Sequence, residues 1–284
     1  MEILKSIESL KAYRENYDQV AFVPTMGNLH EGHISLTREA LKKHRHCIVS
    51  IFVNPLQFGP NEDFDAYPRT LEDDTKKLQI LLEEFPGASI AVFAPENSNI
   101  MFPKGYATKI RNEKFEGILC GKSRPGHFEG VLTVVHKLFK IVNPTSAFFG
   151  LKDFQQFHLI KSMCHDLEMD VELVGCPIVR NENGLALSSR NNYLSDEDKQ
   201  LALKLSRSIH EVLDLTKGKT WQDCKETVSK KIEGILLDKN YEWDYLEIRN
   251  KESLETPQDE NSRFVVLGAM YVNGTRLIDN MFTE

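Results

Sequence analysis

Short apolar runs alternate with helical spacing along the first part of the chain. Residues 20–23 and 47–53 are apolar and rich in β-branched side chains, which is typical of buried strands. Between them, the spacing of Ile34, Thr37 and Leu41 among charged residues predicts a helix. This strand–helix–strand unit has about the length that a parallel βαβ crossover needs.

The same alternation continues along the next hundred residues. The pattern predicts strands at 89–94, 146–149 and 171–174, and helices at 70–84 and 128–142. Strands that alternate with helices are typical of an α/β fold with a parallel sheet. We therefore predict a Rossmann-like, doubly wound parallel sheet, within a first domain of residues 1–178.

The pattern changes in the C-terminal third. Two long helices at 195–215 and 221–237 precede three predicted strands, and Asn273-Gly274 between the last two predicts a hairpin. Helices followed by antiparallel strands indicate a smaller C-terminal α+β subdomain, residues 179–284. At the other end, residues 2–17 are predicted to form an amphipathic helix.

Pro24 is predicted to stop the first strand, and the turn after it contains candidate ligand-binding residues. Residues 24–28 (PTMGN) lead into a helix start, where amide groups and the helix dipole favour phosphate. His30 and His33 are three residues apart, so both can face one ligand, and a histidine there tends to stay neutral and donate an N–H. One alternative is a pair that only caps the helix. Another is a zinc site with Glu31, although the metalloprotease motif has its histidines four residues apart.

Three further loops contain polar residues at predicted strand ends. Gln57 follows the second strand and is either a ligand contact or a turn-stabilising side chain. Residues 150–153 (GLKD) repeat the opening design of strand, glycine and polar helix start, with Gln156 just beyond. Residues 188–190 (SSR) combine two hydroxyls with a guanidinium, which suits phosphate oxygens but also occurs in ordinary helix caps.

Composition narrows the function further. The chain has 284 residues, 41% of them hydrophobic, and a net charge of -7, which argues against nucleic acid or an anionic membrane as partner. Positive charge for a phosphate ligand must then be concentrated locally. The five cysteines are scattered and form no Cys-x-x-Cys pair, which favours a reduced, cytoplasmic protein. The charged N-terminus does not resemble a signal peptide, and no apolar run approaches the ~18 residues of a membrane span.

Seven motifs then occur in order along nearly the whole chain: PTMGNLHEGH, FVNPLQFGP, DAYPRT, GKSRPGHFEGV, FFGLKDFQQ, LALSSRN and GTRLIDN. Together they resemble the pantoate-β-alanine ligase family of the nucleotidylyltransferase superfamily, with a HIGH-like motif at His30–His33. The resemblance implies ATP-dependent condensation of (R)-pantoate with β-alanine through a pantoyl adenylate, with release of pyrophosphate and AMP. It also implies Mg2+ with the ATP, a cytoplasmic homodimer, and a nucleotide- and pantoate-binding first domain with a lid-like second one.

The resemblance further implies site residues. His33 would act as proton donor with His30 beside it, and Lys152 and Arg190 would meet the phosphate charge. Gln57 and Gln156 would bind pantoate, and Gln57 would also contact β-alanine. The residues implied for ATP binding are Met26, Gly27, Asn28, Leu29, His30, Glu31, Gly32, His33, Gly150, Leu151, Lys152, Asp153, Val179, Leu187, Ser188, Ser189 and Arg190.

Two departures from the family pattern bear on the site. Leu151 replaces a commonly polar residue, so that it offers ATP only its backbone or an apolar contact. Lys77 is the second departure, since it stands where some members have a further polar neighbour of the metal. The metal assignment concerns Asp73 and Asp74, which are either magnesium ligands or first-turn acids that match the helix dipole.

Two rival functions remain open on the sequence alone. A true nucleotidylyltransferase would stop at a nucleotide-bearing product, but the two glutamines placed for a small hydroxy acid argue against it. A non-catalytic ATP-binding sensor would bind ATP without pantoate-dependent pyrophosphate exchange.

Overall fold

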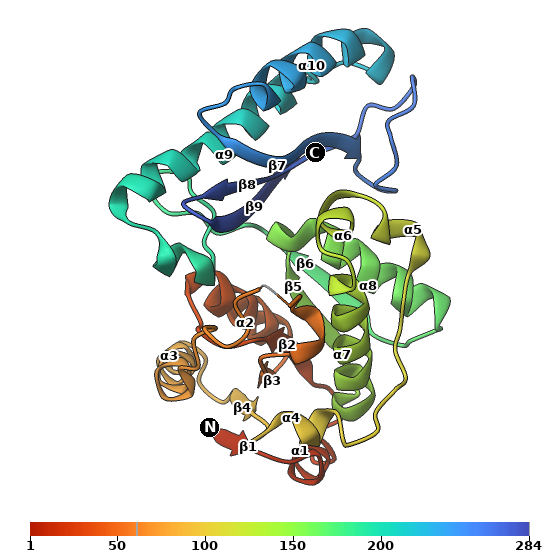
Figure 1. Cartoon of the computed structure of the whole chain (residues 1–284). Coiled ribbons are helices and arrows are strands. Elements are labelled where there is room, and N and C mark those ends of the chain that lie inside the picture. Colours follow the sequence, from red (N-terminus) through yellow and green to blue (C-terminus); the bar gives the residue numbers. More distant parts are fainter. Residues whose placement is uncertain (61, 284) are drawn as a thin grey trace. The chain divides into compact units, whose positions relative to one another are not determined.

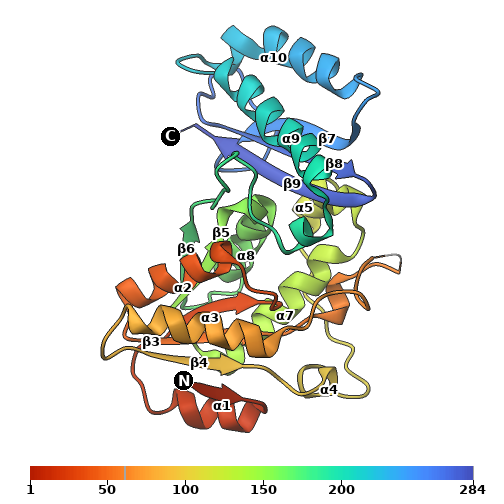
Figure 2. The ribbon, with the colours of Figure 1, turned by 90° about the vertical axis from the view of Figure 1, so that its left-hand side faces the viewer.

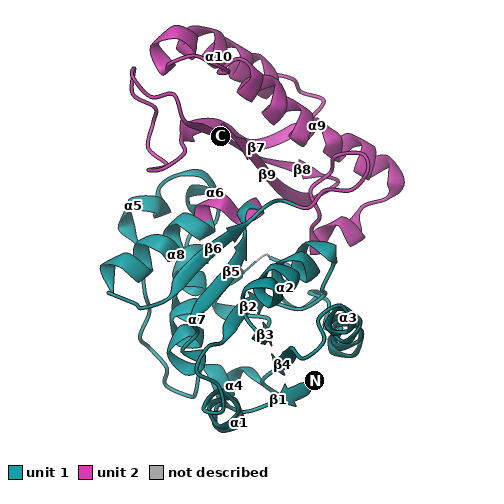
Figure 3. Cartoon of the chain, turned by 180° about the vertical axis from the view of Figure 1, so that it is seen from behind, with its two compact units in different colours: residues 1–151, 156–178 teal, residues 152–155, 179–284 magenta. Residues whose placement is uncertain are grey.

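The computed structural model describes residues 1–60 and 62–283, which form two compact units (Figure 3). Unit 1 consists of Met1–Leu151 and Gln156–Ile178, and unit 2 of Lys152–Gln155 and Val179–Glu284. Each unit has its own sheet and its own core.

The short segment Lys152–Gln155 groups with the C-terminal residues, which a single boundary at 178/179 does not anticipate. The Phe154 ring lies 5.6 Å from the ring of Phe282, and the Asn280 side chain donates a 2.9 Å hydrogen bond to the Lys152 carbonyl. Apolar and polar contacts thus both tie this segment to the end of the chain.

Unit 1 contains, among the described residues, a six-stranded parallel sheet in the order β1-β4-β3-β2-β5-β6 (Figure 1). Its strands are β1 (Glu2–Leu4), β2 (Ala21–Thr25), β3 (His46–Ile51), β4 (Ser89–Phe93), β5 (Ser146–Gly150) and β6 (Glu172–Cys176). From β2 the chain runs outward through β3 and β4 and then returns to β5 on the other side of β2, so the switch point of the sheet lies between β2 and β5. In doubly wound sheets, ligands bind outside the carboxyl ends of the strands at this switch point. The predicted Rossmann-like sheet is confirmed.

Side chains alternate between the two faces of this sheet. Val23 and Phe148 belong to a core that also contains apolar residues of α2 and α3. Phe22 and Phe149 point the other way, and each ring lies 6.2 Å from the ring of Phe139 in α7. Figure 2 shows α2 and α3 side by side along the sheet. Both faces are covered, as the continuous apolar strand sequences require.

The helices of unit 1 connect these strands. They are α1 (Ile7–Arg14), α2 (Glu31–Lys43), α3 (Leu71–Glu83), α4 (Ser98–Met101), α5 (Glu113–Glu116), α6 (Leu119–Ser123), α7 (His127–Val142) and α8 (Phe154–Asp166), with 3-10 turns η1 (Pro55–Gln57) and η2 (Leu151–Asp153). The first residues of α8 belong to unit 2.

Two sequence predictions in unit 1 are wrong in detail. The N-terminal segment is not one helix, because β1 pairs with β4 before Ser6 caps α1. Pro24 does not stop β2 but lies within it, opposite Ser50 of β3. The missing N–H is tolerated since β2 pairs with β5 only at Ala21 and Phe22, which leaves one neighbouring strand at Pro24.

Unit 2 is built on a three-stranded antiparallel sheet in the order β7-β8-β9, counted over its described residues. Helices α9 and α10 pack on it and share one apolar core with it. Its elements are η3 (Ser189–Tyr193), α9 (Asp196–Asp214), α10 (Trp221–Leu236), β7 (Glu242–Asn250), β8 (Phe264–Val272) and β9 (Thr275–Phe282). The predicted α+β class of this region is confirmed, including the hairpin at residues 273–274.

Candidate active site

The turn between β2 and α2 has an unusual backbone. Gly27 and Asn28 both have positive φ, +82° and +50°, which glycine and asparagine tolerate better than most residues. The Thr25 hydroxyl accepts a 3.2 Å hydrogen bond from the Gly27 N–H and donates one of 2.7 Å to the Ser50 carbonyl. The sequence TMGN therefore turns the chain sharply from the strand into the helix.

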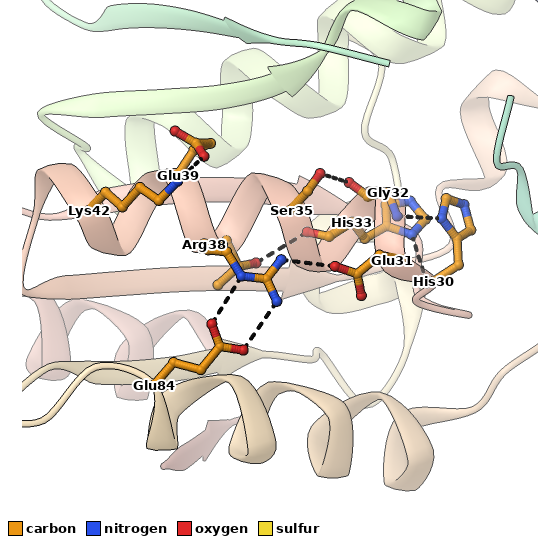
Figure 4. Close-up of polar contacts among 10 residues, drawn as sticks. His30, Glu31, Gly32, His33, Ser35, Arg38, Glu39, Lys42 and Glu84 are labelled. Atoms are coloured by element: carbon orange, nitrogen blue, oxygen red, sulfur yellow. Dashed lines mark hydrogen bonds and ion pairs between the residues drawn. The ribbon is translucent and has the colours of Figure 1, made fainter. Parts of the chain in front are cut away.

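His30 and His33 cap the start of α2 reciprocally (Figure 4). His30 Nδ1 accepts from the Gly32 N–H at 3.1 Å, and His33 Nδ1 accepts from the His30 N–H at 3.3 Å. Their ring centroids are 4.1 Å apart. Because each Nδ1 accepts, the proton of each neutral ring lies on Nε2. The pair is thus a helix cap and also a pair of oriented N–H donors.

The Glu31 side chain has a different partner. Arg38 Nη1 donates to Glu31 Oε1 at 2.8 Å, and Arg38 Nε donates to Glu84 Oε2 at 3.1 Å (Figure 4). The carboxylates hold the pKa of the Arg38 guanidinium above its usual range. These ion pairs join the first turn of α2 to the end of α3, and they engage the Glu31 carboxylate with Arg38.

Gln57 and Met26, predicted for different ligands, lie against each other. The Gln57 amide nitrogen lies 3.1 Å from Met26 Sδ, and its Oε1 accepts from Asn54 Nδ2 at 3.0 Å. Asn54 is buried and also donates to the Gly130 carbonyl at 3.1 Å. Both predicted residues therefore belong to one local cluster of unit 1.

A second network holds the backbone of Gln57. His127 Nδ1 lies 2.8 Å from the Gln57 carbonyl, and Arg124 Nη1 lies 2.9 Å from His127 Nε2. A guanidinium only donates and a carbonyl only accepts, so His127 is the neutral tautomer protonated on Nδ1. Arg124 also binds both Glu62 oxygens, at 2.7 and 2.6 Å. Burial is the largest single influence and raises the pKa of the Glu62 carboxyl, but the hydrogen bonds and charge of Arg124, together with the Gly59 backbone N–H, hold that pKa below its usual value.

The strand β5 ends at Gly150, beside the switch point. Leu151 packs its side chain over Gly175 of β6, where an added Cβ would lie 2.7 Å from Leu151 Cδ2. This packing explains why an apolar residue occupies the position. Gln156, in the first turn of α8, is half-buried.

In unit 2, Lys152 is held by residues of the last strand. Asn280 Nδ2 donates to the Lys152 carbonyl, and the Asn280 N–H donates to Asp279 Oδ1 at 2.8 Å. Arg180 donates to both Asp279 oxygens, at 2.7 and 2.9 Å, in a pair where the Asp279 side chain is only 3% exposed. A cavity of about 10 Å³ lies beside Lys152 and Asn191, room for one water molecule.

The remaining predicted ATP-binding residues of unit 2 follow one another along the chain. The Leu187 N–H donates to the Val179 carbonyl at 2.9 Å, which closes a short hairpin. Ser188 then caps η3 by accepting from the Arg190 N–H at 3.3 Å, and Ser189 is buried. This arrangement fixes the backbone on both sides of the two hydroxyls.

Asp73 and Asp74 have unlike surroundings. The Asp73 side chain is 68% exposed and lies 3.8 Å from Lys76 Nζ. Asp74 is fully buried, and its oxygens accept the Asn28 N–H at 2.9 Å and the Leu29 N–H at 2.7 Å. No cluster of three His, Cys, Asp or Glu that could hold a metal exists in residues 1–60 and 62–283. Because both of its oxygens accept backbone N–H groups, Asp74 does not fit a magnesium ligand, while the exposed Asp73 stays a prediction.

Comparison with known proteins decides the family. The family model for pantoate-beta-alanine ligase matches residues 2–282. The chain belongs to the pantoate-β-alanine ligase family. A pantothenate synthetase of Acetivibrio thermocellus is 47% identical over the full length of both chains, and one of Thermosipho africanus is 44% identical over 99% of both.

Solved structures agree with this membership. The pantothenate synthetase of Thermus thermophilus superposes with a TM-score of 0.87 at 38% identity, over 99% of both chains. The pantoate-β-alanine ligase of Francisella tularensis, complexed with β-γ ATP and β-alanine, gives 0.72 at 32% identity, over 99% of this chain and 97% of that one. Among residues 1–60 and 62–283 of the present chain, no helix is both long enough and apolar enough to cross a membrane.

Sequence reasoning assigned no role to several residues that support the predicted ones. They are Asn54, Lys77, Arg124, His127, Asp279 and Asn280. Most lie within the quoted family motifs, so the signal was present. Their partners lie up to 128 residues away, however, and no local pattern names them.

Proposed function

We propose that this chain joins (R)-pantoate to β-alanine in two steps at the carboxyl edge of its parallel sheet. As a member of the pantoate-β-alanine ligase family, the chain is an ATP-dependent ligase. The observation that carries the residue assignment is the reciprocal capping of His30 and His33. It directs two imidazole N–H groups from a helix start at the switch point of a doubly wound sheet.

In the first step, a pantoate carboxylate oxygen attacks the α-phosphorus of ATP. The bond between the α- and β-phosphates breaks, pyrophosphate leaves, and pantoyl adenylate forms. Phosphoryl chemistry of this kind needs positioning and charge stabilisation more than covalent help. His33 acts as proton donor and His30 binds the phosphates, while Lys152 and Arg190 neutralise the charge that develops on them.

The ATP site in this proposal uses backbone amides as well as side chains. Residues 26–33 and 150–153 supply strand-end turns, while Val179 and residues 187–190 supply the hairpin and its cap. Leu151 and Glu31 contribute through their backbones, because their side chains pack on Gly175 and pair with Arg38.

In the second step, the β-alanine amine attacks the activated acyl carbon, the bond between that carbon and the AMP oxygen breaks, and the nitrogen gives up a proton to water as the amide forms and AMP leaves. Gln57 and Gln156 bind pantoate, and Gln57 also contacts β-alanine. An amide side chain offers both a donor and an acceptor, which matches the hydroxyls and carboxylate of pantoate. The Asn54 and His127 hydrogen bonds support this role because they fix the Gln57 side chain and backbone.

We extend the proposal to the setting of the enzyme. Mg2+ enters with ATP, but Asp74 does not fit it because backbone N–H groups engage both of its oxygens, so no step is assigned to the ion. The first domain binds nucleotide and pantoate, and the second acts as a lid. The protein works as a cytoplasmic homodimer. The five cysteines support a reducing compartment, since all are buried thiols.

The decisive experiment measures pyrophosphate and AMP release from ATP. Pyrophosphate should appear only when pantoate is added, and AMP and pantothenate should appear only when β-alanine is also present. Pyrophosphate release that ignores pantoate and requires a nucleotide precursor or phosphopantetheine would instead establish a nucleotidylyltransferase. ATP binding without pantoate-dependent exchange would establish a non-catalytic sensor.

A further inference from the structure

The helix α3 reaches the backbone of the turn between β2 and α2 through two side chains. Asp74 Oδ2 accepts from the Asn28 N–H at 2.9 Å, and Asp74 Oδ1 accepts from the Leu29 N–H at 2.7 Å. Asp74 is fully buried, and the Thr70 hydroxyl adds a bond of 3.3 Å to Oδ2. A buried carboxylate with both oxygens occupied by hydrogen bonds holds those donors strongly.

Lys77, one turn further along α3, binds the same backbone segment. Its Nζ donates to the Leu29 carbonyl at 2.6 Å. The N–H and the C=O of Leu29 are therefore both bound by α3, one by Asp74 and the other by Lys77. The Lys77 charge also stabilises the ionised form of the buried Asp74 carboxyl. Burial raises the pKa of Asp74, while the backbone donors and Lys77 oppose that rise.

These contacts hold a turn whose backbone conformation is unfavourable for most residues. Asn28 has a positive φ, and Gly27 is packed so closely that an added Cβ would lie 3.1 Å from Asp74 Oδ2. Leu29 directly precedes His30, whose own N–H is bonded to His33. A change in the Leu29 peptide would therefore reorient both imidazoles.

We propose that Asp74 and Lys77 are positioning residues that hold the Asn28–Leu29 backbone, and through it His30 and His33, in the geometry that ATP requires. This inference rests on the proposed function of the turn. It assigns the Asp74 carboxylate to backbone N–H groups and not to a cation, and it gives Lys77 a role that follows from its contact with Leu29.

The test compares five variants of the full chain, one of which, Asp73→Asn, removes the exposed carboxylate next to Asp74. Asp74→Asn keeps the shape of the side chain but places an amide donor against a backbone donor. Lys77→Met removes the ammonium and Lys77→Arg retains a donor, at a residue that is exposed. Glu72→Gln is the matched control, because it removes a charge from the same helix turn at a side chain 85% exposed.

Two measurements are made on each variant. Hydrogen exchange of the Asn28 and Leu29 amides, without substrates, reports the backbone directly. Pantoate-dependent pyrophosphate release, over a range of Mg2+ concentrations, gives the KM for ATP and kcat. In Asp74→Asn we expect roughly ten- to hundred-fold faster exchange at both amides and a rise of similar size in the KM for ATP. Lys77→Met should show smaller changes of the same kind, Lys77→Arg should restore most of the loss, and Glu72→Gln should match the wild type.

Three results would overturn the proposal. One is unchanged exchange at both amides in Asp74→Asn. Another is recovery of Asp74→Asn at high Mg2+, with the same recovery in Asp73→Asn, since that would indicate a shared metal site. If Asp74→Asn does not fold, the test rests on Lys77→Met. Amide exchange and a KM for ATP equal to those of the wild type in Lys77→Met would refute the role of α3. Absence of pyrophosphate release from the wild type refutes the proposed function alone, because the exchange experiment needs no activity.

Discussion

Replacing Gly130 of α7 with alanine should have two opposite effects on stability, a gain in helix propensity and a steric clash with η1. Intrinsic helix propensity favours alanine over glycine by about 1 kcal/mol in a helix interior. In this helix, however, an added Cβ would lie 2.1 Å from the Leu56 oxygen, 2.3 Å from the Leu56 carbonyl carbon and 2.6 Å from the Gln57 nitrogen. All three are backbone atoms of η1, so no side chain can rotate away to make room.

The size of the effect follows from these distances. Cβ contacts below 3.0 Å essentially do not occur, so α7 and η1 must separate by about 0.9 Å to relieve the shortest one. Overpacking of this kind costs about 1–3 kcal/mol, which exceeds the gain in propensity. Because η1 carries Gln57, a shift of roughly 1 Å is also enough to impair catalysis about 10²-fold.

The assay combines urea unfolding with substrate kinetics. We expect Gly130→Ala to lose up to about 2 kcal/mol of unfolding free energy and to raise the KM for pantoate more than the KM for ATP. Gly234→Ala is the control: it is the same substitution inside α10, where no atom other than the local helix backbone lies within 4 Å of the added Cβ, and it should gain about 0.5–1 kcal/mol. Equal stability changes in the two variants, with the KM for pantoate unchanged in both, would refute the argument.

Three further predictions concern single side chains. His33→Ala should lower turnover by roughly 10²–10⁴-fold, since it removes the proton donor, and should cost only about 1 kcal/mol of stability from the lost cap; near-wild-type turnover would exclude His33 from the mechanism. Gln156→Ala should raise the KM for pantoate more than that for ATP in steady-state assays, and the reverse order would reassign this residue to the nucleotide. Glu62→Gln should be less stable than the wild type by about 1–2 kcal/mol at pH 7, because it breaks a pair whose side chains are 15% and 26% exposed. The folded-state pKa of Glu62 lies below its ordinary value of 4.5, so this difference should be complete above pH 4.5 and disappear as the pH falls through the folded-state pKa; a difference that persists in acid unfolding curves would contradict the assignment.

Elements that depend on local pattern could be predicted from the sequence. Ser195 and Asp198 read as a capping box, and α9 begins at Asp196 with both capping bonds present. The run at 146–149 becomes β5, and Asn273-Gly274 joins β8 to β9. In each case, the residues that decide the structure lie within a few positions of one another.

The candidate site depends on contacts that no local pattern encodes. Asp73 and Asp74 are adjacent acids in the first turn of one helix, and the sequence gives no reason to separate them. Only the packing of α3 against the β2–α2 turn buries one and exposes the other. The contact between Asn280 and Lys152 spans 128 residues in the same way. The motifs indicate the candidate segments, but side-chain partners across the fold required the structure.

The split of residues 151–156 between the units has a practical consequence for anyone who dissects this enzyme. The polypeptide changes unit after Leu151, after Gln155 and after Ile178, so a cut at 178 does not release two intact bodies. An excised N-terminal piece would retain Phe154 and Lys152 without Phe282 and Asn280, their apolar and polar contacts. Co-expression of the two pieces should therefore yield more soluble protein than either piece alone.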